Sequence, residues 1–332
     1  MYYQDIKLFT SQSIVDEMVD NLAFTLGVGR EDLNIVATAK GLISGPIDLF
    51  MREGDMMRCG LPSKNGTLLP PIGSVEKVDF AETNWILVIE KEATFRTLVA
   101  AQYANSSTGG PGILITGKGY PDLATRRFLH TLHAMRPQIN IFALVDFDPP
   151  GIAILRNFQY GSKRLKHEEN STVPDIKWLG IRSSDLGSIF SQGAAPRLQE
   201  SRADESDSQS TQDTSSQESI SYSQSSTSSS LAQSGASLPT DFQEEPPRKR
   251  RRVEQTTRDS TKTISPLTQA DRKRAIETMN DIHDTKNTKR DAEQLRELQR
   301  MLMMNIKAEI QAVDHYGDIT DWLNEKLRSH LG

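Results

Sequence analysis

The chain has 332 residues, of which 36% are hydrophobic and 25% are charged, and its formal net charge is −5. This length allows about two domains, and the composition is that of an ordinary soluble protein. No apolar run approaches the roughly 20 residues of a transmembrane helix, and the first residues do not resemble a signal peptide. The single cysteine, Cys59, excludes an internal disulfide and argues against a cysteine-based zinc site.

The charge is distributed unevenly along the chain. Residues 191–247 contain two arginines and nine acidic residues, a net charge of −7, which leaves +2 for the rest of the chain. A nearly neutral body with an acidic insert does not exclude nucleic-acid binding. It does require that any basic surface be local.

An insert at residues 191–262 is dominated by Ser, Thr, Gln and acidic residues. This composition cannot bury enough apolar surface to offset the entropy of ordering, so we expect the insert to be disordered and open to phosphorylation. Near its end, two prolines precede a compact basic run of Arg248, Lys249, Arg250, Arg251 and Arg252. Such a run is typical of a nuclear localisation signal, although a solvated charge run or a non-specific DNA-binding patch shows the same pattern.

The N-terminal part of the chain begins with an expected amphipathic helix at residues 11–26. Its apolar residues recur at helical spacing: Val15, Met18, Val19, Leu22 and Leu26. Ser11 or Ser13 can cap this helix, and Gly27 can end it. Residues 33–38 predict a strand. Residues 41–73 are rich in Gly and Pro and predict a loop region with short strands.

Strands and helices alternate from residue 85 onward. Continuous apolar runs predict buried strands at 85–89, 113–115 and 141–145. Helical patterns lie at 93–104, at 122–135 and at 151–160, after the Pro-Pro-Gly that ends the third strand. This alternation predicts an α/β fold with a parallel Rossmann-like sheet and right-handed crossovers. A further long helical pattern lies at 291–313. We expect this helix to pack in the domain core or to form a dimer surface.

Acidic residues follow two of the expected strands. Glu90 ends the first strand, and Asp146 and Asp148 follow the third. Parallel strands end at the same edge of a sheet, where ligands bind in open α/β folds, and residues two apart on a strand point the same way. With no basic residue expected beside them, these carboxylates should repel one another unless a divalent cation binds, and Mg²⁺ suits such a site. The alternative for the Asp pair alone is that it caps the next helix.

Several stretches carry a resemblance to a known family. The stretches VIEKEA at 88–93 and DFDPPG at 146–151 resemble a Toprim domain, the metal-binding module of topoisomerases, primases and some nucleases. The stretches at 115–126, 158–162, 173–180 and 304–312 resemble the A subunit of topoisomerase VI. They resemble still more its eukaryotic relative, the transesterase that makes meiotic DNA double-strand breaks. The resemblance covers roughly residues 2–185 and 266–331.

The resemblance implies a catalytic residue and a domain division. The nucleophile of the family is a tyrosine in a winged-helix-like domain, and the stretch MYYQD at 1–5 makes Tyr3 that residue. We therefore expect a partial winged-helix-like domain at 1–75 and a Toprim domain at 80–190. The disordered insert at 191–262 and a C-terminal helical part at 263–332 follow. Because the family has further residues before the tyrosine, we expect this chain to be a truncated form.

The resemblance also implies a cofactor and partners. Glu90, Asp146 and Asp148 would bind Mg²⁺, and Lys118 and Arg126 could contact DNA phosphates, although ordinary surface basic residues would look the same. The expected partners are duplex DNA, a second copy of the chain, meiotic accessory proteins and an ATPase-like B subunit, on meiotic chromosomes in the nucleus. Two alternatives remain: a Toprim-type hydrolytic nuclease, and a catalytically inactive, truncated DNA-binding member of the family.

Overall fold

The computed structural model describes residues 6–30, 32–33, 35, 39–60, 65–162, 165, 168–187, 263–284 and 288–331. Tyr3, the insert at 191–262 and its basic run at 248–252 lie outside the described residues. The described residues before and after the insert belong to one compact unit. Among the described residues, no helix has both the length and the apolar character that crossing a bilayer demands.

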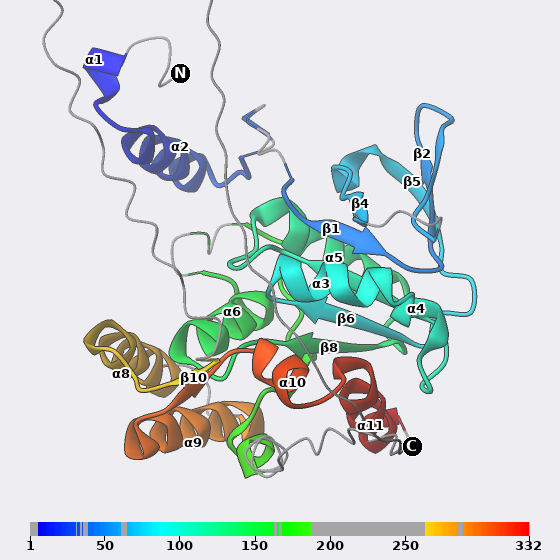
Figure 1. The fold of residues 1–332 in the computed structure, drawn as a ribbon. Helices are drawn as coiled ribbons and strands as arrows, with labels where there is room; N and C mark the ends of the chain where they lie inside the picture. Colours follow the sequence, from blue (N-terminus) through cyan, green and yellow to red (C-terminus); the bar gives the residue numbers. More distant parts are fainter. Residues whose placement is uncertain are drawn as a thin grey trace, which may run out of the picture. The chain divides into compact units, whose positions relative to one another are not determined.

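A six-stranded sheet with the order β4-β1-β7-β6-β8-β9 organises this unit (Figure 1). Its parallel part consists of β7 (Gly112–Thr116), β6 (Trp85–Ile89), β8 (Asn140–Leu144) and β9 (Lys177–Gly180). On the β7 side it continues antiparallel with β1 (Leu42–Ser44) and β4 (Thr67–Leu68). Every residue of β6 and β7 is buried, as their continuous apolar runs predict. The predicted α/β fold with a parallel sheet is confirmed.

The crossover helices follow the predicted alternation with one difference. They are α3 (Glu92–Ala100), α4 (Tyr103–Ser106), α5 (Leu123–Met135) and α6 (Pro149–Tyr160). The single helix predicted at 93–104 is broken at Gln102, which has a left-handed φ of 52°. Tyr103, which follows the break, is buried beside Trp85, with 5.8 Å between ring centroids. Tyr103 thus packs in the core directly after the break, which helical periodicity does not reveal.

A second, three-stranded antiparallel sheet has the order β3-β2-β5. Its strands are β2 (Asp48–Met51), β3 (Met56–Arg58) and β5 (Val75–Asp79). The short strands β1 to β4 fall in the predicted loop region at 41–73, whereas β5 was not predicted. Three of its five residues are exposed and three are charged, so it lacks the apolar run on which strand prediction depends.

The N-terminal segment consists of α1 (Ile6–Phe9) and α2 (Gln12–Leu26). The predicted helix at 11–26 is confirmed, and Gly27, with a φ of 66°, ends it. The predicted strand at 33–38 is not found at its described positions, because Leu33 lies in a turn and Ile35 has no regular structure. Residues 34 and 36–38 lie outside the described part of the chain.

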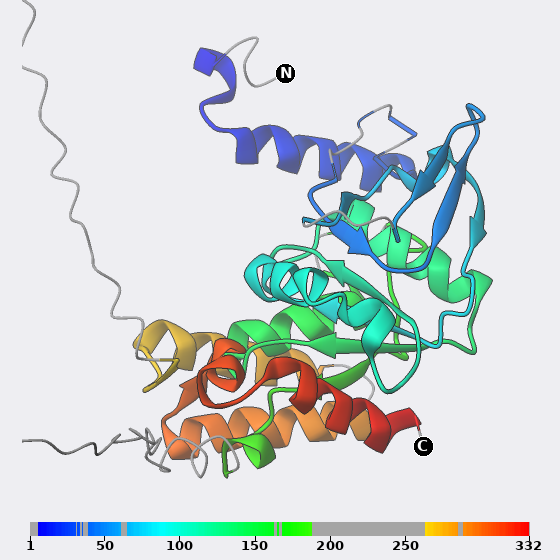
Figure 2. The same cartoon turned by 45° about the vertical axis from the view of Figure 1, so that its right-hand side comes forward.

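The C-terminal part packs against α6. Its elements are β10 (Ile264–Ser265), α8 (Gln269–His283), α9 (Lys289–Met304), β11 (Lys307–Ala308), α10 (Gln311–Tyr316) and α11 (Ile319–Leu331). Figures 1 and 2 show α8 and α9 beside α6. The long helix predicted at 291–313 is wrong beyond Met304, because Asn305 takes a left-handed φ of 55° and ends α9. The chain then pairs β11 with β10.

Candidate metal centre

The three predicted acidic residues meet at one edge of the sheet. The strands β6 and β8 are parallel neighbours, with Ile89 opposite Leu144. Glu90 and Asp146 therefore leave the sheet side by side, and Glu90 Oε2 accepts a hydrogen bond of 2.9 Å from the Asp146 main-chain N–H. Asp148 lies two residues further on, directly before α6. The structure thus brings together the three carboxylates that the strand order predicts.

Each carboxylate has one oxygen fixed by a main-chain amide. Besides the Glu90 bond, Asp146 Oδ1 accepts from the Ile310 N–H at 2.8 Å, and Asp148 Oδ1 accepts from the Gly151 N–H at 2.7 Å. Asp148 is the N-cap of α6, so the capping alternative holds for this residue. Capping uses only one of its oxygens. Among the described residues, no hydrogen bond engages the other oxygen, and such outer-shell bonds are what orients metal-binding carboxylates.

A lysine lies beside these acidic residues, although we expected no basic residue there. Lys91 Nζ is 3.0 Å from Asp146 Oδ2 and 3.0 Å from Glu309 Oε2, and it donates to Gln311 Oε1 at 2.7 Å. Burial would lower the pKa of Lys91, but the carboxylates of Asp146 and Glu309 outweigh it and raise that pKa. The ammonium is therefore charged at neutral pH. It partly offsets the negative charge of the site.

Even with the Lys91 ammonium beside them, the ionised forms of the three carboxylates are destabilised. Burial, followed by repulsion from Asp146, raises the pKa of Glu90 to about 8, and the same two causes raise the pKa of Asp148 to about 6. Burial also raises the pKa of Asp146 against the attraction of Lys91. Carboxylates with raised pKa values at a sheet edge are short of positive charge, which a divalent cation would supply.

The donor set fits Mg²⁺ in its chemistry, since it consists of hard carboxylate oxygens held by main-chain bonds. Within the described residues, however, no three acidic, histidine or cysteine side chains are already gathered around one point that could hold a metal ion. The ligand roles of Glu90, Asp146 and Asp148 therefore stay predictions.

The two predicted DNA contacts lie in different environments. Lys118 follows β7 in a turn with a φ of 55°, and its Nζ is 3.4 Å from Glu92 Oε1. Arg126 lies on α5 and is only 2% exposed. In the described part of the chain its Nε and Nη1 have no hydrogen-bond partner. Lys118 is accessible to a DNA phosphate, whereas the burial of Arg126 does not favour that role, and both contacts stay predictions.

Three residues at this edge were not predicted to take part in the site: Lys91, Glu309 and Gln311. The position of Lys91 directly after Glu90 was a usable signal, because neighbouring residues at a strand end share one edge. The residues from the C-terminal part gave no such signal. Glu309 is 218 positions from Lys91 in the sequence, and the helix expected there concealed the bend that brings it to the site.

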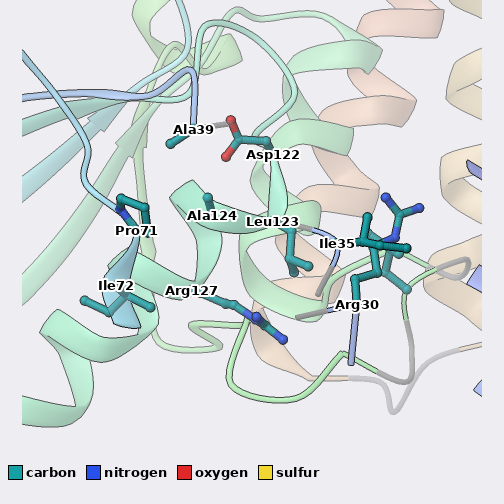
Figure 3. Close-up of a pocket in the computed structure, with 10 residues that line it drawn as sticks. Arg30, Ile35, Ala39, Pro71, Ile72, Asp122, Leu123, Ala124 and Arg127 are labelled. Carbon is teal, nitrogen blue, oxygen red and sulfur yellow. The ribbon is translucent and has the colours of Figure 1, made fainter. Parts of the chain in front are cut away.

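A separate cavity of about 180 Å³ lies against the start of α5 (Figure 3). Its lining consists of Arg30, Ile35, Ala39, Pro71, Ile72, Asp122, Leu123, Ala124, Arg127 and Leu165. None of these is Glu90, Asp146 or Asp148. Asp122 is engaged in the fold, since it caps α5 and accepts from the Lys40 N–H at 2.8 Å. The cavity is therefore distinct from the candidate metal centre.

A parallel sheet with a glutamate after one strand and an Asp-x-Asp after its neighbour defines the Toprim class of metal-binding α/β domains. A sequence model that describes the Toprim domain of the topoisomerase 6 A subunit and Spo11 matches residues 85–234, and one described as type IIB DNA topoisomerase matches residues 1–35. Together they cover more than half of the chain. The chain belongs to the family of the topoisomerase 6 A subunit and Spo11.

Similar proteins come from plants, fungi and animals. The chain is 38% identical over 189 residues to the A subunit of DNA topoisomerase 6 from Arabidopsis thaliana, covering 56% of this chain and 43% of that protein. It is 36% identical over 186 residues to the meiotic recombination protein rec12 of Schizosaccharomyces pombe, covering 56% and 50%. It is 35% identical over 191 residues to the meiotic recombination protein SPO11 of Homo sapiens, covering 56% and 46%. The matched region thus spans about half the length of these relatives.

Proposed function

We propose that this chain forms the DNA double-strand breaks that initiate meiotic recombination, by a topoisomerase-like transesterification through Tyr3. Its family and the names of its fungal and human relatives support this function. The structural observation that carries the proposal is the meeting of Glu90, Asp146 and Asp148 at one sheet edge, each with a carboxylate oxygen fixed by a main-chain amide. Such a site suits chemistry on a phosphate.

In the proposed reaction the phenol oxygen of Tyr3 attacks a phosphorus of the DNA backbone. A bond forms between that oxygen and the phosphorus, and the bond from the phosphorus to the 3′ oxygen of the neighbouring sugar breaks. The phenol loses its proton and the released 3′ oxygen gains one, which leaves a 5′-phosphotyrosyl link. One ester replaces another, so the cleavage itself needs no nucleotide hydrolysis. A phenol with a pKa near 10 is a weak nucleophile at neutral pH and needs activation.

Glu90, Asp146 and Asp148 would hold Mg²⁺ at this site. When bound, the ion would stabilise the negative charge on the phosphate and the leaving oxygen. The chain's own contribution is to orient the carboxylates through the amides of Asp146, Gly151 and Ile310. Lys118 follows the neighbouring strand β7, and it would hold a flanking DNA phosphate.

The proposal includes a twofold assembly on DNA, because cutting both strands requires two tyrosines. Each site would combine Tyr3 of one protomer with the acidic residues of the other. Further meiotic accessory proteins and an ATPase-like B subunit would complete the assembly on meiotic chromosomes. The basic run at 248–252 would direct the chain to the nucleus.

Adduct trapping tests the reaction. The full chain is incubated with Mg²⁺, 3′-labelled duplex DNA and candidate B-subunit partners, then denatured, and the label attached to protein is measured. Tyr3→Phe and Asp146→Asn should each abolish the adduct, whereas the neighbouring Tyr2→Phe and the exposed Asp175→Asn should retain it. Mixing the two inactive variants should restore part of it if protomers share sites.

The two alternatives give different results in the same experiment. A hydrolytic nuclease would cut DNA without an adduct and would tolerate Tyr3→Phe. A catalytically inactive DNA-binding protein would bind duplex DNA with a steep dependence on salt and would leave it uncut with every partner tried. Either result would refute the proposed transesterification.

A further inference from the structure

The Lys91 ammonium is held by three oxygens at the candidate metal centre. They are Asp146 Oδ2 and Glu309 Oε2, each at 3.0 Å, and Gln311 Oε1 at 2.7 Å. The side chain of Lys91 is 23% exposed, and the residue is the N-cap of α3, directly after Glu90. An ammonium has three donors and no acceptor, so these three contacts use its full hydrogen-bonding capacity.

The contact with Asp146 involves the oxygen that a metal ion would need. The other oxygen of Asp146 already accepts from the Ile310 N–H at 2.8 Å, so Oδ2 is the oxygen of this carboxylate that the main chain leaves available. Magnesium binds carboxylate oxygens at about 2.0–2.1 Å. An ammonium hydrogen-bonded to that oxygen competes with the ion for its lone pairs and also repels it.

We propose that Lys91 competes with Mg²⁺ for Asp146 Oδ2, and that an ion bound to this carboxylate would displace the ammonium from Asp146 while Glu309 and Gln311 retain it. The inference rests on the Mg²⁺ site of the proposed function. It adds a competing internal cation, and it assigns Glu309 and Gln311 as the positioning residues that hold this cation when the ion is bound.

The C-terminal segment that carries these two residues is fixed in place. Ala308 pairs with Phe147 through two main-chain hydrogen bonds of 2.8 and 3.1 Å, and the Ile310 N–H bonds to Asp146. The main chain that carries Glu309 and Gln311 is therefore anchored at the sheet edge by bonds that do not involve the ammonium. Because they already accept two of its three hydrogen bonds, its departure from Asp146 breaks only one.

Two substitutions should change Mg²⁺ affinity in opposite directions. Lys91→Met removes the competitor, and we expect the Mg²⁺ dissociation constant to fall about ten-fold, the equivalent of one charge-assisted hydrogen bond. Glu309→Gln weakens the hydrogen bonding that would hold the displaced ammonium, and we expect the Mg²⁺ dissociation constant to rise several-fold. In the Lys91→Met background, Glu309→Gln should have no further effect, because no ammonium remains to be held.

Calorimetric titration of the full chain with Mg²⁺ alone measures these constants, and thermal unfolding in EDTA checks that each variant is folded. Lys177→Met is the matched control, because Lys177 Nζ donates to Asn140 Oδ1 at 2.7 Å at the opposite end of β8. Its Mg²⁺ affinity should equal that of the natural chain. Asp146→Asn should abolish binding in every background.

The possible outcomes separate this inference from the proposed function. An unchanged or weaker Mg²⁺ affinity in Lys91→Met, with normal Mg²⁺ binding by the natural chain, would overturn the inference but not the proposed metal site. An equal loss from Glu309→Gln with and without Lys91 would mean that Glu309 acts on the ion directly, which also overturns it. If neither the natural chain nor Lys91→Met binds Mg²⁺, the metal site and the inference are both refuted.

Discussion

A buried ion pair between α6 and α9 offers a quantitative test of how the C-terminal part is held to the Toprim sheet. Arg156 Nη1 is 2.6 Å from Asp291 Oδ1, and the two side chains are 9% and 1% exposed. The same Nη1 donates to Gln294 Oε1 at 2.8 Å. Asp291 also forms a capping box with Thr288 at the start of α9. Asp291→Ala should therefore remove the carboxylate partner of a buried arginine and one half of a capping box at once.

The expected loss in the free energy of unfolding is about 4 kcal/mol. About 3 kcal/mol comes from the buried arginine that loses its carboxylate partner, and about 1 kcal/mol comes from the lost capping contact. Asp271→Ala is the matched control, because Asp271 forms the same capping box with Thr268 at the start of α8. Its ion-pair partner, Lys307, has a more exposed side chain (26%), so the control should lose only about 1–2 kcal/mol.

Equilibrium unfolding in urea, followed by circular dichroism, measures both losses. The reasoning is refuted if Asp291→Ala costs no more than Asp271→Ala, since the buried pair would then add nothing beyond the cap. Acid titration gives a second test. Burial raises the pKa of Asp291, but hydrogen bonds from Arg156 and Thr288 outweigh it and lower that pKa.

The ionised Asp291 makes its full contribution to the free energy of unfolding above its unfolded-state pKa of about 3.9. This contribution is lost as the pH falls through the lower folded-state pKa. The stability difference between the natural chain and Asp291→Asn should therefore shrink in acid.

Two further predictions concern a glycine at the site and the single cysteine. A Cβ on Gly151 would lie 2.4 Å from the Asp146 carbonyl oxygen, so Gly151→Ala should cost about 2 kcal/mol of stability and weaken Mg²⁺ binding in calorimetry. Gly73→Ala, where the added atom meets nothing within 4 Å, should change neither, and normal binding by Gly151→Ala would contradict the expected strain. Burial, followed by repulsion from Asp48, raises the pKa of the Cys59 thiol to about 12. Iodoacetamide should therefore label Cys59 slowly in the folded chain even at mildly alkaline pH and fast after denaturation, and fast native labelling would refute this.

The strands that could be predicted are those buried on both faces. The run predicted at 85–89 coincides with β6, because a run of only five apolar residues is typical of a strand buried on both faces. The predicted helix at 122–135 begins as expected, because the Asp122 side chain accepts from the Thr125 N–H at 2.7 Å. The exposed, charged strand β5 could not be found this way, and neither could the end of α9, which depends on the left-handed conformation of Asn305.

The acidic part of the site could be predicted for the same reason. Parallel strands end at one edge of a sheet, so the positions of Glu90, Asp146 and Asp148 along the sequence were enough to predict that they lie close together. The contacts that hold these side chains could not be predicted. The bond from Ile310 to Asp146 spans 164 positions, and it depends on a bend after α9 where the sequence pattern continues as a helix.

The site is therefore completed by residues outside the region that the Toprim sequence model matches. That match ends at residue 234, whereas the amide of Ile310 and the side chains of Glu309 and Gln311 come from the C-terminal segment beyond it. The pairing of Ala308 with Phe147 joins that segment to the sequence between Asp146 and Asp148. An isolated Toprim fragment would keep all three carboxylates and lose an amide that orients Asp146 and two of the oxygens that hold Lys91. The candidate metal centre is thus built from the sheet together with its C-terminal segment.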